Sequence, residues 1–123
     1  MSGFKRFEDI DAWQKARELN KEIFILTKEN KLLKNDFSLK NQMRRSSISI
    51  MANIAEGFAR KGDKEFAQFL YISRGSSCEL KNYVYTCLDI NYINKNTFTE
   101  LLDQINEVEK IIYGLIKYLR KDQ

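Results

Sequence analysis

Apolar residues recur every three or four positions along most of the chain, which is the spacing of one face of an α-helix. The first stretch of this kind begins near Asp9 or Asp11 and runs to about Lys28. Acidic residues crowd its start, where the helix dipole favours negative charge. A polar connection, residues 28–36, follows, and we expect it to be partly helical.

The second helix is predicted from about Ser38, as its N-cap, to Ala59. The third is predicted from Asp63, also as an N-cap, to about Asp89.

A turn covers residues 91–96, and the fourth helix opens with a capping box formed by Thr97 and Glu100. The chain has no proline, and no segment shows the alternation of a strand. Four helices with short connections predict an all-α, antiparallel up-and-down four-helix bundle that forms one domain, residues 1–123.

The second helix has two apolar faces, whereas a peripheral bundle helix needs one. One face carries Leu39, Met43, Ile50 and Ile54. The other carries Ile48, Ala52, Ala55 and Ala59. This pattern indicates that another copy of the chain covers the second face. The alternative is that this helix is central in its own bundle.

Positive charge is concentrated on the second helix and the turn after it. The chain has a net charge of +4, and residues 37–62 carry five basic side chains and one acidic. Such an excess is typical of a surface that meets nucleic-acid phosphates. The candidate binding residues there are Lys40, Arg44, Arg60, Lys61 and Lys64. No base-reading motif is present, so we expect binding through backbone charge and shape.

The residue types give little support for catalysis. Histidine is absent, and no glycine-rich phosphate loop is present. Cys78 and Cys87 are about 13 Å apart along one predicted helix, too far for a disulfide. We interpret them as reduced, buried apolar residues, and expect no metal and no cofactor.

Arg45 and Glu79 fall at roughly opposite positions in the predicted hairpin of the second and third helices. A buried or half-buried ion pair that fixes the register of these helices accounts for both residues. The third helix also contains Gly75 next to Ser76, small residues that permit a close helix approach. Tyr71 and Tyr85 are the better candidates for exposed aromatic contacts.

The N-terminal ten residues contain no apolar stretch of the kind found in signal peptides, and no apolar run approaches the ~20 residues of a membrane span. We therefore expect a cytoplasmic protein with no membrane partner.

Two segments resemble a bacterial family of four-helix-bundle proteins named after the intervening sequences of 23S ribosomal RNA genes. They are QMRRSSISIMANIAEGFAR, residues 42–60, and EFAQFLYISRGSSCEL, residues 65–80. The opening FEDIDAWQKARELNKEIF, residues 7–24, also fits the family spacing.

The resemblance implies a left-handed bundle that assembles as a cyclic homopentamer with a central channel. A similar bundle serves diversity-generating retroelements as an accessory protein that binds nucleic acid and a reverse transcriptase. The chain departs from the family at Arg74, where alanine is common. Arg74 either adds a basic group to a nucleic-acid surface, channel or interface, or pairs with an acidic neighbour.

We therefore hold two hypotheses of function. The first is a non-catalytic, basic homo-oligomer that binds RNA or DNA, with Arg74 added to the candidate residues. The second is a scaffold that docks a protein partner, such as a nucleic-acid enzyme, without useful affinity of its own for nucleic acid. The residues assigned to helix register or the subunit interface are Arg45, Asn53, Glu56, Ser76 and Glu79.

Overall fold

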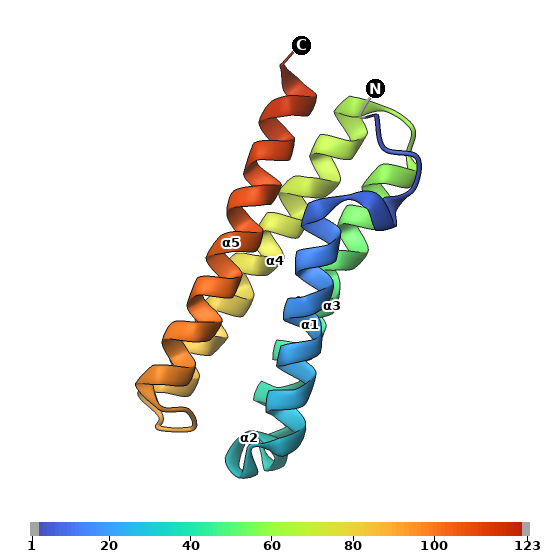
Figure 1. The fold of residues 1–123 in the computed structure, drawn as a ribbon. Helices are drawn as coiled ribbons and strands as arrows, with labels where there is room; N and C mark the ends of the chain where they lie inside the picture. The colour runs from blue at the N-terminus through green and yellow to red at the C-terminus, as the bar shows by residue number, and fades with distance from the viewer. Residues whose placement is uncertain (1–2, 122–123) are drawn as a thin grey trace.

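Four long helices lie side by side in the computed structural model, which describes residues 3–121 (Figure 1). After a short 3-10 turn, Phe7–Asp9, the elements are α1 (Asp11–Glu29), α2 (Lys31–Asn35), α3 (Phe37–Ala59), α4 (Asp63–Asp89) and α5 (Lys95–Arg120). The described residues contain no strand. The prediction of an all-α fold is confirmed, as is the partly helical connection, which is α2.

The long helices alternate in direction, and each packs against two others in the order α1, α3, α4, α5 around the bundle (Figure 1). The first and last described residues therefore lie at the same end as the α3–α4 turn, while α2 and the α4–α5 turn lie at the other end. This is the antiparallel up-and-down arrangement that the sequence predicts.

The helices begin at caps that differ from the predicted ones. Ser38 does not cap α3; Asp36 does, by accepting a hydrogen bond from the Leu39 backbone amide. Asp63 is the first residue of α4, and Gly62 is its N-cap.

The predicted capping box of the last helix is also wrong. The cap of α5 is Asn94, whose side chain accepts from the amide of Thr97. Asp36 and Asn94 lie two and three residues upstream of the predicted caps Ser38 and Thr97, and their side-chain oxygens reach amides of the first turn directly.

The core is an apolar column with small polar residues at the helix contacts. Its largest fully buried side chains are Ile10, Leu19, Ile23, Leu33, Met43, Ile50, Ile54, Leu70, Leu80, Ile105, Ile112 and Ile116. Buried Ser73 on α4 donates a 2.6 Å hydrogen bond to the carbonyl of Ile50 on α3. Ser47 on α3 donates to the side-chain oxygen of Asn20 on α1 at 2.8 Å. These bonds satisfy polar groups that burial would otherwise penalise.

The two cysteines differ in environment. Both are free, but Cys87 is buried and Cys78 is exposed, so the prediction of two buried thiols is wrong for Cys78. Cys87 packs against the sulfur of Met43 at 3.7 Å. Burial, and to a smaller extent the charge of Asp36, raises the pKa of the Cys87 thiol to about 11. A thiol with a raised pKa stays protonated and unreactive at neutral pH.

Candidate nucleic-acid interface

The predicted basic residues occupy three separate regions of the bundle. Lys40 and Arg44 lie on the half of α3 nearer α2, and Arg74 lies between α4 and α5. The remaining three, Arg60, Lys61 and Lys64, surround the α3–α4 turn.

Arg44 and Lys40 already have partners within the chain. Arg44 donates from Nε to Thr27 Oγ1 at 2.8 Å, and its guanidinium lies 4.5 Å from the centre of the Phe24 ring. These contacts join α3 to α1. Lys40 donates to the carbonyl of Lys34 at 3.3 Å and lies over the Phe37 ring. A nucleic-acid role for these two residues stays a prediction, and it would compete with their packing.

The α3–α4 turn presents the more accessible cations. Lys61 and Lys64 are exposed. Lys61 has a φ of 63°, in the left-handed region that a helix end commonly adopts. Arg60 pairs with Glu56 at 2.9 Å, one helical turn back. The turn therefore carries at least two lysines whose charges project into solvent.

The end of α5 extends this basic surface, and sequence reasoning missed it. From Lys110 to Lys121 the helix and its cap carry four basic residues and no acidic one. The preceding stretch, residues 97–109, carries four acidic residues and no basic one. Counting charge over the whole segment hides this polarity; dividing the helix in half would have revealed it. Because α5 is antiparallel to α4, its basic half lies beside the α3–α4 turn (Figure 1).

Two cation–tyrosine clusters join α4 to α5 in this basic half. Arg120 donates to the hydroxyl of Tyr71 at 2.6 Å, and its guanidinium lies 5.8 Å from the ring centre. Arg74 lies 4.9 Å from the centre of the Tyr113 ring, and the Lys117 ammonium lies 5.5 Å from it. Arg74 therefore pairs with an aromatic ring at the α4–α5 groove. Tyr71 and Tyr85 are both exposed, as expected.

The predicted ion pair between Arg45 and Glu79 is not formed within the chain. Both side chains are exposed, and among residues 3–121 no salt bridge joins them. Serine hydroxyls occupy the contact between the helices instead: Ser49 and Ser76 are 2.8 Å apart, and Asn53 donates to Ser49 at 2.9 Å. Charges on the outer side of α3 and α4 gain more from water than from this contact.

The second apolar face of α3 is uncovered within the chain. Ile48 is 45% exposed, Ala52 and Ala59 are exposed, and Ala55 is partly exposed. Ile72, on the outer side of α4, is 52% exposed. The alternative that α3 is central in its own bundle is therefore wrong, because no other helix among residues 3–121 covers this face.

Other kinds of site find little support in the part of the chain that the structure describes. Residues 3–121 hold no group of three or more acidic or cysteine side chains that could bind a metal ion. Within the same residues, no helix is both long enough and apolar enough to cross a bilayer.

Comparison with known proteins agrees with this fold. The family model described as 23S rRNA-intervening sequence protein matches residues 8–114. The chain belongs to this family. A crystal structure from Bacteroides thetaiotaomicron, described as a protein with unknown function from the S23 ribosomal protein family, has the same fold. It shares 24% sequence identity with a TM-score of 0.78, covering 86% of this chain and 95% of that chain. No protein among those with curated functions matches the sequence.

Proposed function

We propose that this member of the 23S rRNA-intervening sequence protein family is a non-catalytic nucleic-acid-binding protein. The observation that carries the proposal is the cluster of basic residues at the end of the bundle that holds both the α3–α4 turn and the basic half of α5, where they outnumber the acidic Asp63 and Glu65 of the first turn of α4. Lys61, Lys64 and the four basic residues of 110–121 supply positive charge on neighbouring elements. Clustered lysines and arginines attract phosphate backbones and release condensed counterions when they bind.

RNA is the first ligand to test, because the family description names 23S rRNA. Phosphate contacts carry no sequence information, so we expect affinity that depends on charge and salt rather than on sequence.

The two free cysteines are consistent with a cytoplasmic protein, since thiols stay reduced in that compartment.

We further propose that the chain assembles with itself through the outer side of α3 and α4. Exposed Ile48 and Ile72 supply apolar area there, and Arg45 and Glu79 supply opposite charges without a partner salt bridge within residues 3–121. Five copies, the number that the family resemblance implies, would repeat the basic surface and bind a polyanion by many weak contacts.

The experiment is light scattering with and without a labelled RNA hairpin, at low and physiological salt. Binding that weakens steeply with salt, on a particle larger than one chain, supports both proposals. Ile48→Glu should give a monomer, while Ile25→Glu, at an exposed position on α1, should not. A wild-type monomer would overturn self-assembly. An assembled particle with no affinity for RNA or DNA at either salt would favour the scaffold hypothesis.

A further inference from the structure

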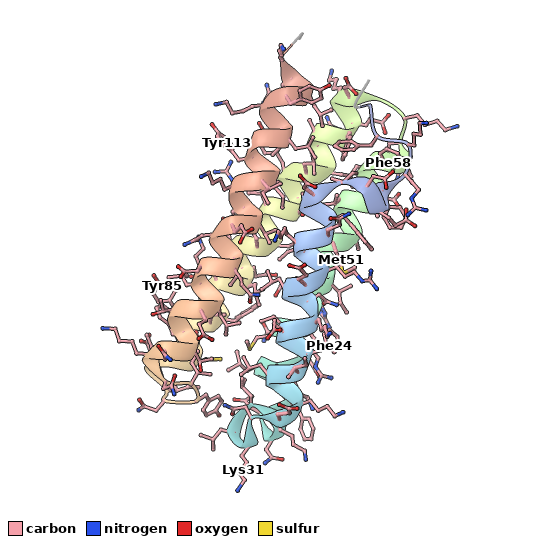
Figure 2. All side chains as sticks on the ribbon, viewed as in Figure 1. Phe24, Lys31, Met51, Phe58, Tyr85 and Tyr113 are labelled. Atoms are coloured by element: carbon pink, nitrogen blue, oxygen red, sulfur yellow. The ribbon has the colours of Figure 1, made fainter. Side chains whose placement is uncertain are left out.

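The outer groove between α4 and α5 contains two exposed tyrosines held beside cations. Tyr71 is 42% exposed and Tyr113 is 46% exposed. Figure 2 shows Tyr113 projecting outward from the half of α5 that leads to the C-terminus. A cavity of about 230 Å³ lies beside the first pair, lined by Lys64, Ala67, Gln68, Tyr71 and Arg120. Tyr85 and Tyr118 are exposed to a similar degree, so exposure alone does not mark a site. Tyr71 and Tyr113 are distinguished by the cations held against their rings, a combination of apolar ring, polar hydroxyl and positive charge that suits an interface.

Charge in this part of the groove has one sign. On α4, Arg74 is the one charged residue between Phe66 and Cys78. On α5, residues 110–121 are basic or uncharged. The other end of the groove differs, because Lys81 forms a salt bridge with Glu109 there and the acidic half of α5 follows. The unbalanced cations and the exposed rings therefore occupy the same half of the groove.

Exposed aromatic rings beside cations suit the chemistry of a single-stranded nucleic acid. Aromatic side chains stack on unpaired bases, and cations beside them contact the phosphates. In a duplex the base faces are already stacked on one another, so a tyrosine on a helix surface can meet only the backbone or a groove edge. An acidic protein segment would use the cations, but its carboxylates do not stack on aromatic rings as every unpaired base can.

We infer that this half of the α4–α5 groove binds single-stranded nucleic acid, with Tyr71 and Tyr113 stacking on bases and Arg74, Lys117 and Arg120 contacting phosphates. The inference rests on the proposed nucleic-acid-binding function and assigns it a site and a strand preference. Each tyrosine exchanges its cation contact for a base, and the cation turns to the adjacent phosphate.

The groove does not overlap the surface proposed for self-assembly. On α4, Ser76 faces α3, where it meets Ser49, whereas Arg74 and Tyr71 face α5. Ile48 lies on α3, which is separated from α5 by α4 and α1 in the order of packing. The residues proposed to start self-assembly and the residues of the groove therefore lie on different sides of α4.

The test compares three ligands of matched length by fluorescence anisotropy at about 0.15 M salt: a labelled dT12 strand, an abasic strand of twelve units, and a 12-bp DNA duplex. The abasic strand carries the same phosphates as dT12 but has no bases. We expect dT12 to bind most tightly. Tyr113→Ala should weaken dT12 binding about tenfold and leave the abasic strand within about twofold. Tyr113→Phe should keep the wild-type affinity, because the ring remains.

Two matched controls isolate the groove. Tyr118→Ala removes a tyrosine that is 51% exposed on the same helix, about 140° around the axis from Tyr113. Tyr85→Ala removes one that is 45% exposed in the same groove at its acidic end, and Figure 2 labels both Tyr85 and Tyr113 on the outer side of the α4–α5 pair. Neither change should alter dT12 binding by more than about twofold. Circular dichroism melts and light scattering of each variant confirm that the fold and assembly are retained.

The outcomes separate this inference from the proposed function. Equal binding of dT12 and the abasic strand, or no effect of Tyr113→Ala, would overturn the stacking site while leaving charge-led binding intact. Displacement of both strands by poly-glutamate with unchanged affinity in Tyr113→Ala would also overturn it, since the groove would then recognise charge alone. Failure of every ligand to bind the wild type at low salt would overturn both proposals.

Discussion

Gly57 on α3 lies so close to Phe69 on α4 that a β-carbon added to Gly57 would be 2.7 Å from the β-carbon of Phe69. The same added carbon would be 3.2 Å from the carbonyl oxygen of Phe66. Glycine is therefore required here for close packing of two helices, not for an unusual backbone conformation. This contact lies one helical turn before the α3–α4 turn and sets how closely α3 and α4 approach each other at that end of the bundle.

Gly57→Ala should destabilise the fold by about 1–3 kcal/mol, because the two backbones must separate to admit a methyl group. The gain in helix propensity, about 1 kcal/mol, only partly offsets this cost. Gly114→Ala is the matched control, since nothing lies within 4 Å of its added carbon. Its urea midpoint should rise. Equal midpoints for the two variants would contradict the close contact.

Substitutions at Arg44 and Lys61 should have different effects: the first should lower stability, and the second should weaken nucleic-acid binding. Arg44→Ala removes the hydrogen bond to Thr27 and the contact with Phe24, so we expect a loss of about 1 kcal/mol in unfolding free energy. Lys61→Asn removes a charge while tolerating the left-handed backbone, so stability should hold. Lys61→Asn should instead reduce nucleic-acid affinity and the salt dependence of binding. Chemical denaturation and anisotropy, measured on the same preparations, test both expectations. If Arg44→Ala weakened nucleic-acid binding and Lys61→Asn did not, the binding surface would instead lie near Arg44.

The two thiols should react at very different rates. Cys78 is exposed, whereas Cys87 is buried and its pKa is raised to about 11. Iodoacetamide at pH 8 should therefore label Cys78 within minutes and Cys87 only after denaturation. Mass spectrometry of tryptic peptides identifies the labelled site. Cys78→Ser serves as the control and should leave the folded protein unlabelled; rapid labelling of that variant would show that the core opens.

Stability should fall as the pH rises from 9 to about 11. The folded pKa of Cys87, about 11, lies above the usual value of 9.0, so the folded state holds this proton more tightly. The stabilisation is complete below pH 9 and is lost as the pH approaches the folded value. The pKa of Tyr92 is raised as well, chiefly by the hydrogen bond that its hydroxyl donates to Asp36. Ionisation of Tyr92 therefore also lowers the stability of the folded state as the pH rises.

A Cys87→Ala and Tyr92→Phe double variant should be less stable at pH 8 but should show a shallower decline between pH 9 and 11. Urea midpoints at each pH supply the comparison with the wild type. The lysines and remaining tyrosines titrate in both proteins, so the difference isolates these two groups. Parallel declines would contradict the expectation.

The helices themselves are predictable because their signal is local. The three- and four-residue spacing of positions such as Ile50 and Ile54 marks the buried face directly, and absence of proline allows long helices. The second apolar face of α3 could also be predicted from the sequence, because Ile48 and Ala52 cannot lie on the same side of a helix as Ile50. The N-caps were less predictable, because several neighbouring polar residues could each cap the same helix. Asp36 and Asn94 cap α3 and α5 in place of the predicted Ser38 and Thr97.

What the sequence alone determined is the set of helices, their order and the faces that they bury, because these depend on residues within a turn or two of one another. The tertiary structure decided which side chains meet across helices. It replaced the expected pair of Arg45 and Glu79 with Ser49 and Ser76, and it brought Tyr113 beside Arg74 and Arg120 beside Tyr71. Such contacts join residues about 30 to 50 positions apart in the chain, and their geometry follows from how closely and at what rotation the helices pack. The basic, tyrosine-bearing groove exists only once α4 and α5 are packed together.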